Sequence, residues 1–104
     1  MRIIRNQEFA LNQICGSSLK GYTKATYKRL VEVLGPPTFS EASLDDKTQV
    51  EWVVKFKNDY FTIYDWKTYD REYTMNELTI FHVGGKIDAF DFICKLESKI
   101  NKGN

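Results

Sequence analysis

Residues 52–73 read WVVKFKNDYFTIYDWKTYDREY, and they are the most informative part of the sequence. In residues 50–56, apolar side chains occur at every second position, namely Val50, Trp52, Val54 and Phe56. This is the period of a β-strand. A turn at 57–60, with Asn58-Asp59 at its tip, separates this strand from a second one. The stretch therefore predicts an antiparallel hairpin with strands at about 49–56 and 60–67.

The same stretch holds eight aromatic residues within 22 positions, more than one face of a hairpin can bury. Side chains alternate between the two faces of a strand. We expect Phe61 and Ile63 to face the core helices, and Tyr64 and Trp66 to point to the outer face, free for a partner. The alternative is the reversed register, in which Tyr64 and Trp66 are core residues.

Asp65 and Lys67 share the face of Phe61 and Ile63, where an unpaired buried charge is costly. We therefore expect both to lie at the rim of the sheet. There Asp65 is expected to bond a backbone or loop group and to order residues 68–77, while Lys67 stays solvated.

A helix at about 24–34 precedes the hairpin. Its apolar side chains fall on one stripe and its start can be capped by Thr23 or Thr26. Gly35 and the two prolines after it end the helix. The stripe consists of Tyr27, Leu30, Val31 and Leu34.

After the hairpin, alternation predicts a third strand at 78–83. An apolar face containing Ile87, Phe90 and Cys94, with Ile93 and Ile100 as candidate further members, predicts a helix at 86–101. Leu19 and Tyr22 suggest a short strand with a kink at Gly21. The buried residues are expected to include Tyr27, Leu30, Leu34, Trp52, Val54, Phe90 and Cys94.

The fold class is therefore α+β, in the order β-α-β-β-β-α. We expect an antiparallel meander sheet of three to four strands, with two helices packed on one face. A chain of 104 residues suits a single domain spanning 1–104. Residues 1–15 have no clean period and are read as an irregular arm, a short strand or a short helix; residues 102–104 are a frayed tail.

The charge is nearly balanced, with 15 basic and 14 acidic residues, which argues against a strongly basic nucleic-acid binder. The first thirty residues are nevertheless basic, with Glu8 as their one acidic side chain. They supply candidate anion-binding residues for a nucleotide or nucleic acid: Lys20, Lys24, Lys28 and Arg29. The alternative is a solvated positive face.

Neither a signal peptide nor an apolar run long enough to span a bilayer is recognisable, so we expect a cytoplasmic protein with no membrane association. Cys15 and Cys94 are far apart in sequence. They are expected to be buried free thiols, with a Cys15–Cys94 disulfide as the alternative.

No motif for catalysis, metal or cofactor binding is present. Cys15, His82 and Asp65 can be written as a triad, but a lone histidine in an alternating strand is typically structural. One histidine and two distant cysteines give no metal-ligand spacing. Gly84-Gly85-Lys86 lacks a phosphate-loop pattern and is read as a strand-to-helix turn, with anion binding as the alternative. We therefore expect a non-enzymatic protein without a cofactor or metal.

Tyrosine and tryptophan dominate protein-binding hot spots, so the outer aromatic face favours a protein partner. The candidate contact residues are Tyr60, Tyr64, Trp66, Lys67 and Tyr69.

Four segments carry a family resemblance: GYTKATYKRLVEVLGPPTF (21–39), EWVVKF (51–56), TIYDWKTYD (62–70) and HVGG (82–85). In this order the chain resembles small, uncharacterised proteins of tailed phages and prophages, with Phe81 standing where they have tryptophan. The resemblance implies a phage setting and no particular catalysis. In that setting we expect a binding protein that inhibits a host defence protein in the host cytoplasm, of the anti-CRISPR or anti-restriction type. The matching residues are Tyr27, Leu30, Val31, Leu34, Gly35, Pro37, Glu51, Trp52, Ile63, Tyr64, Asp65, Lys67, His82, Gly84 and Gly85.

Overall fold

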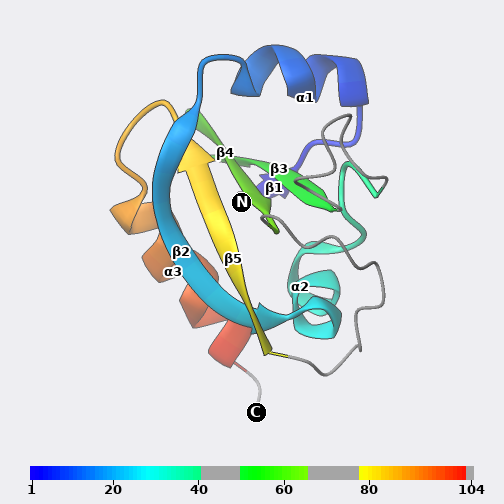
Figure 1. Ribbon diagram of the computed structural model, residues 1–104, viewed down its shortest axis with the longest axis vertical. Coiled ribbons are helices and arrows are strands. Elements are labelled where there is room, and N and C mark those ends of the chain that lie inside the picture. The colour runs from blue at the N-terminus through cyan, green and yellow to red at the C-terminus, as the bar shows by residue number, and fades with distance from the viewer. Residues whose placement is uncertain (41–49, 66–77, 103–104) are drawn as a thin grey trace.

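The computed structural model describes residues 1–40, 50–65 and 78–102 of the chain (Figure 1). The elements follow in chain order: β1 (Arg2–Ile3), α1 (Gln7–Ile14), β2 (Ser18–Thr26), α2 (Tyr27–Leu34), β3 (Glu51–Phe56), β4 (Asp59–Tyr64), β5 (Leu78–Gly85) and α3 (Phe90–Asn101).

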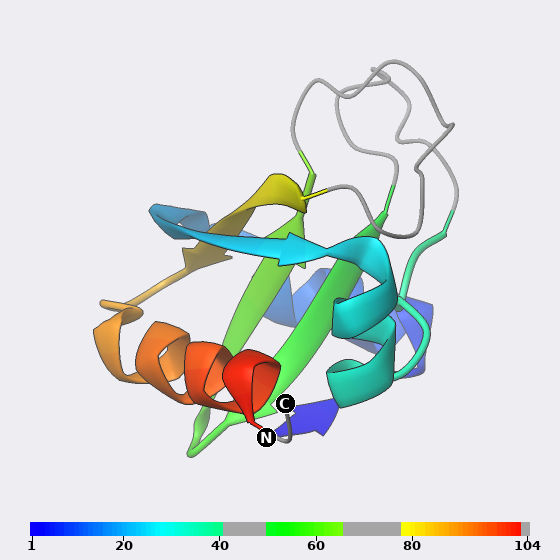
Figure 2. The ribbon, with the colours of Figure 1, turned by 90° about the horizontal axis from the view of Figure 1, so that it is seen from below.

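The strands form one antiparallel sheet in the order β1-β3-β4-β5-β2. Helices α2 and α3 lie on one face of this sheet and α1 lies on the other (Figure 2). The predicted α+β class and antiparallel pairing are confirmed. The predicted strand and helix numbers were too low, because residues 1–15, read as an irregular arm, a short strand or a short helix, form both a strand, β1, and a helix, α1.

The central hairpin has the register that the alternation predicts. Trp52 pairs with Ile63 and Val54 pairs with Phe61, so all four point to the face covered by α2 and α3. The reversed register is therefore excluded. The turn itself is one position earlier than expected: Phe56 pairs with Asp59, and Lys57, rather than Asn58 or Asp59, takes the positive φ of 58°. A two-residue turn matches the twist of the flanking strands, so the strand pairing fixes which residues enter it.

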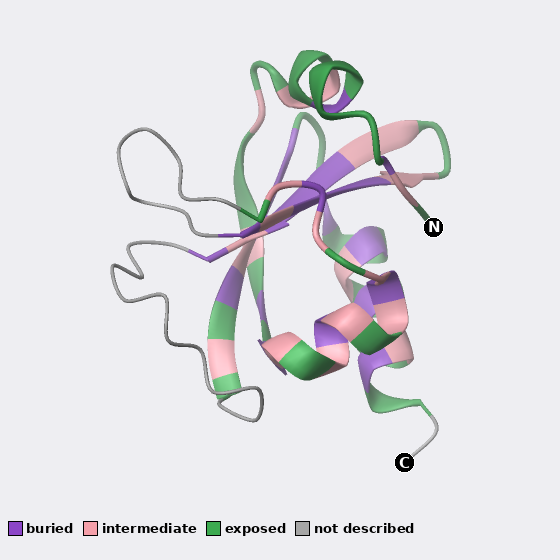
Figure 3. Cartoon of the chain, turned by 90° about the vertical axis from the view of Figure 1, so that its right-hand side faces the viewer, coloured by how far each residue is buried: buried purple, intermediate pink, exposed green. Residues whose placement is uncertain are grey.

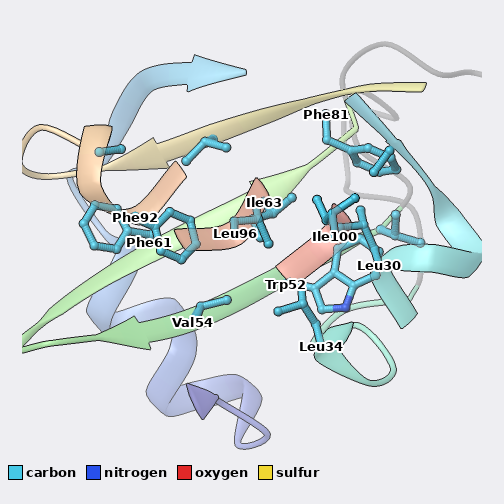
Figure 4. Packing of buried hydrophobic residues seen from close by; sticks show 14 residues of the cluster. Leu30, Leu34, Trp52, Val54, Phe61, Ile63, Phe81, Phe92, Leu96 and Ile100 are labelled. Atoms are coloured by element: carbon cyan, nitrogen blue, oxygen red, sulfur yellow. The ribbon is translucent and has the colours of Figure 1, made fainter. Parts of the chain in front are cut away.

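The main core lies between the hairpin, β5, α2 and α3 (Figure 4). Trp52 is at its centre, fully buried, with ring contacts to Tyr27 at 5.8 Å and Phe81 at 6.0 Å between centroids. Its indole Nε1 donates a hydrogen bond to the carbonyl of Gly35 at 2.9 Å. Burial of Leu30, Leu34, Trp52 and Val54 is confirmed; Tyr27, expected to be buried, is half-buried at the edge of this core.

Strand β2 continues directly into α2, which shortens the predicted helix. Thr26 ends the strand and caps the helix, accepting a hydrogen bond from the backbone N–H of Arg29 at 3.0 Å. The kink expected at Gly21 is a shift in the β2–β5 register between Leu19 and Gly21. The helix ends as predicted, because Gly35 adopts a φ of 88°.

Two features of α3 differ from expectation. The helix begins at Phe90 rather than Lys86, and it buries the face formed by Phe92, Leu96 and Ile100. Phe90 is 68% exposed and Cys94 is exposed, so both burial predictions were wrong. Three large apolar residues four positions apart bury more area than the Phe90–Cys94 pair, and they set the rotation of the helix.

The predictions for the two cysteines and for Asp65 also need correction. Cys15 is exposed like Cys94, because it lies at the C-terminal end of α1, and neither forms a disulfide. Asp65 bonds a backbone group as predicted, accepting from the N–H of Val50 at 3.0 Å, but it is fully buried rather than at a solvated rim. This bond ties the end of β4 to the start of β3. The predictions for Trp66, Lys67 and residues 68–77 lie outside the described residues.

Helix α1 covers part of the second face of the sheet. Asn6 caps it, accepting a hydrogen bond from the N–H of Phe9 at 2.9 Å. Ala10 is the residue that it buries, packed with Ile4 and Val53 in a small second core, while most of its surface stays exposed (Figure 3). Helix α1 therefore covers parts of β3 and β4 on this face of the sheet.

Candidate functional site

The face of the sheet opposite α2 and α3 carries a group of apolar and aromatic side chains beyond the reach of α1. Among them, Leu19, Tyr22, Leu78 and Ile80 are 45%, 55%, 64% and 53% exposed. They lie on β2 and β5, where β2 is the edge strand of the sheet. We name this group the outer patch: Leu19, Tyr22, Tyr64, Leu78, Ile80 and His82.

Four outer-face residues form one row across four strands. Tyr22 pairs with His82, His82 with Tyr64, and Tyr64 with Glu51. The His82 ring meets Tyr22 edge-on at 4.9 Å and lies 5.5 Å from Tyr64. Contacts of this kind fix the ring positions, so the row presents a preformed aromatic surface that ends in a carboxylate.

Burial favours the neutral forms of two aromatic residues in this row, His82 and Tyr64. Burial lowers the pKa of His82 below its ordinary value of 6.5. Burial also raises the pKa of Tyr64 above 10.0, helped by the charge of Glu51 and by Tyr22. Glu51 is the acidic residue of this row.

Glu51 is a half-buried carboxylate with a single hydrogen-bond donor among the described residues. The hydroxyl of Thr62 donates to its Oε2. Burial raises the pKa of Glu51 above 4.5 and the nearby Asp65 adds to this, while the Thr62 hydrogen bond works in the opposite direction. The ion pairs within the described residues are Arg29–Glu32 and Lys57–Asp91, so none of the described cations compensates this charge.

This arrangement predicts that Glu51→Gln stabilises the chain at pH 7. In the folded chain the Glu51 carboxyl group keeps its proton to a higher pH than in the unfolded chain. Stability from this group is therefore fully present below about pH 4.5 and is lost as the pH rises through the folded pKa. Glutamine keeps the acceptor for Thr62 and removes the charge. Urea titrations should show a higher unfolding free energy for Glu51→Gln at pH 7, with the gain vanishing at pH 4.

The matched control is Glu97→Gln, since Glu97 also accepts a hydrogen bond from a threonine hydroxyl, that of Thr23, but is exposed. We expect its unfolding free energy to change by less than about 0.5 kcal/mol at either pH. A Glu51→Gln variant that is less stable than wild type at pH 7 would show that the chain itself compensates the Glu51 charge.

Two hollows adjoin the outer patch. One, of about 310 Å³, lies between the α1–β2 connection and the sheet. The other, of about 560 Å³, lies at the β2 edge and reaches α3. The first is lined by Ile14, Ser17, Ser18, Leu19, Glu51, Thr62, Tyr64 and Gly84, and the second by Tyr22, Thr23, Lys24, Ile80, Glu97, Ile100 and Asn101.

The structure brings only part of the predicted contact set to this face. Tyr64 points outward as expected and belongs to the outer patch. Tyr60 lies under α1, with its ring 5.9 Å from that of Phe9, so the chain's own helix covers it. The other three predicted contact residues, Trp66, Lys67 and Tyr69, lie outside the described residues.

The four predicted anion-binding residues do not form one site. Lys24 is exposed on β2 beside Ile80, and Lys20 is exposed on the same strand. Lys28 is exposed on α2. Arg29 is occupied in capping α3, because its guanidinium donates to the carbonyls of Ile100 at 2.7 Å, Lys99 at 3.3 Å and Lys102. Its role is therefore structural.

Tyr22, Ile80 and His82 were missed as candidate contact residues. Their signal was present in the sequence: Tyr22 and Lys24 alternate with Thr23 and Ala25, and the structure exposes the first two and buries the second two. If the predicted strand had been continued from Tyr22 to Thr26, this alternation would have placed Tyr22 on the outer face of the sheet.

Within the described ranges, no group of three or more metal-ligating side chains comes together. Among the same residues, none of the helices has the length and hydropathy that crossing a bilayer requires. No model of a known protein family, no curated protein and no solved structure matches this chain.

Proposed function

We propose that this chain is a small non-enzymatic protein-binding domain that holds its partner on the outer patch. The observation that carries the proposal is the exposure of Leu19, Tyr22, Leu78 and Ile80 on one sheet face, next to a preformed aromatic row. Clustered exposed apolar side chains mark interaction sites, and tyrosines are frequent anchors there.

The charges around the outer patch indicate what the partner presents. Lys24 and Lys20 are exposed on β2, the edge strand, whereas Glu51 lies on β3. A complementary partner surface has an apolar centre and acidic side chains facing these lysines. Because β2 is an edge strand, its free backbone groups also allow an extended partner segment to pair with it.

A second copy of this chain is a less suitable partner for the β2 edge than an acidic protein is. An antiparallel β2–β2 pair centred on Tyr22 sets Lys20 opposite Lys24 of the other copy. Directly opposed like charges destabilise strand pairing, and edge lysines are a common protection against it. The charge pattern therefore favours a different, acidic partner.

The identity of the partner rests on the resemblance to small phage proteins. In that setting the proposed partner is a host defence protein, such as a CRISPR effector or a restriction enzyme, and binding inhibits it. A nucleotide or nucleic acid is the alternative, and its supporting feature is the pair of exposed lysines near the aromatic row. The following experiment separates the two.

Purified chain on a solid support is exposed to nuclease-treated lysate of a bacterial host, and retained proteins are identified by mass spectrometry. The double variant Tyr22→Ser, Ile80→Ser should lose the retained protein, with affinity reduced at least about thirtyfold, as expected for hot-spot residues. An apolar interface should also hold when salt is raised, whereas nucleic-acid binding falls steeply.

The matched control is Ile87→Ser, Phe90→Ser, which removes two exposed large apolar side chains outside the outer patch. This variant should retain the partner as wild type does. Equal retention by both double variants, or retention of nucleic acid in place of protein, would overturn the proposal. So would a wild-type chain that retains no protein at all.

A further inference from the structure

The smaller hollow, which we name the Glu51 pocket, has a polar floor and is lined by residues of five elements, α1, β2, β3, β4 and β5. Glu51 of β3 and Thr62 and Tyr64 of β4 come from the sheet, and Ile14 ends α1. Ser17 and Leu19 contribute from the α1–β2 connection and the start of β2. Its volume of about 310 Å³ is ample for one side chain.

A glycine keeps this floor open. A Cβ at Gly84 would lie 3.0 Å from Cγ2 of Thr62 and 3.3 Å from the carbonyl oxygen of Ser18. At these distances a side chain at position 84 would force its neighbours, Thr62 among them, to move by a few tenths of an ångström. Because Gly84 has no side chain, Thr62 reaches Glu51 and the pocket stays hollow beside it.

Two polar groups of the pocket have unused bonding capacity within the described part of the chain. The Oε1 of Glu51 accepts no hydrogen bond there, and Oε2 has only Thr62. The Ser17 hydroxyl is a buried oxygen without a hydrogen-bond partner. The buried Ser17 hydroxyl and the half-buried Glu51 carboxylate can therefore bond a polar group that enters the pocket.

We infer that the Glu51 pocket binds a basic side chain, arginine or lysine, that the protein partner inserts beside the outer patch. This inference rests on the proposed function and specifies the chemistry of the partner. The carboxylate of Glu51 receives the cation, and the ring of Tyr64 supplies an aromatic wall with a negative face. Leu19 and Tyr64 belong to both the pocket and the outer patch, so one partner reaches both.

The charges of the pocket exclude the other common anchors. An acidic side chain would meet Glu51 with Asp65 behind it, and like charges repel. A metal ion is disfavoured, because no set of three ligating side chains exists among the described residues. An arginine fits better than a lysine, since a guanidinium bonds a carboxylate at two points and stacks on a tyrosine ring.

The test uses purified chain and N-acetyl-arginine methylamide as the probe, followed by amide and side-chain NMR at pH 7. Saturable shifts should appear at Glu51, Thr62 and Gly84, with a dissociation constant of roughly 1–10 mM for so small a ligand. N-acetyl-lysine methylamide should bind at the same residues, more weakly. The citrulline analogue, which has the same shape without the charge, should produce no saturable shift.

In Glu51→Gln the arginine analogue should bind at least about tenfold more weakly, since the charge–charge bond is lost. Glu97→Gln should bind it as wild type does. Absence of saturable shifts in wild type, or equal affinity in Glu51→Gln, would overturn the inference. Because the partner is not in the sample, that failure would remove only the basic anchor. Failure of the outer patch itself would be seen in the capture experiment.

Discussion

Trp52→Ala should lower the free energy of unfolding by about 4 kcal/mol, within the range of about 3–5 kcal/mol found for buried Trp and Phe truncations. Trp52 is fully buried in the core (Figure 4), and its ring contacts those of Tyr27 and Phe81. Truncation also leaves the carbonyl of Gly35 without its indole donor. Domains of this size have only about 5–15 kcal/mol in total, so the variant should be near its folding threshold.

The measurement is urea denaturation followed by far-UV circular dichroism, which does not depend on the tryptophan that is removed. Trp52→Phe keeps most of the volume and should lose much less, about 1–2 kcal/mol, because mainly the hydrogen bond and a small void are affected. A Trp52→Ala variant that loses less than about 1 kcal/mol would contradict the placement of Trp52 at the core centre.

Phe92→Ala should also lower the free energy of unfolding strongly, by about 3–4 kcal/mol, whereas Phe90→Ala should change it by less than about 0.5 kcal/mol. Phe92 is 1% exposed and stacks on Phe61 with ring centroids 4.6 Å apart. It also contacts Phe56 at 5.7 Å. Phe90 is 68% exposed on the same helix.

The two variants make the same chemical change two positions apart, so they measure the rotation of α3 directly. Thermal and urea denaturation of both are sufficient. A larger loss for Phe90→Ala than for Phe92→Ala would mean that α3 turns its other side to the sheet, as the sequence pattern had first indicated.

The hairpin was predictable because the alternation of large apolar residues and a turn signal between the two strands both occur in residues 52–64. Alternation of large apolar residues placed Trp52, Val54, Phe61 and Ile63 on one face, and the structure confirms it. In α3 two apolar series compete, one through Phe90 and Cys94 and one through Phe92, Leu96 and Ile100. Only the shape of the core decides between them, so periodicity alone selected the wrong series.

The candidate site was less predictable, since it depends on pairing between distant segments. Tyr64 was identified from its own strand, but Tyr22 and His82 join it only through the β2–β5 and β4–β5 pairings. Tyr60 has the same alternation as Tyr64, yet α1 covers it. Residues 1–15 have no clean period, so a short helix was only one of three readings of that segment. The Glu51 pocket likewise exists only because α1, β2 and the sheet meet there.

Photo-crosslinking tests most directly the claim that the outer patch is the partner-binding face. The photoreactive residue p-benzoylphenylalanine replaces Tyr22 in one sample and Phe90 in another, two exposed aromatic positions on different elements (Figure 1). After irradiation in host lysate, we expect a covalent adduct with one protein from position 22 and none from position 90. An adduct that forms only from position 90, or equally from both, would contradict that claim.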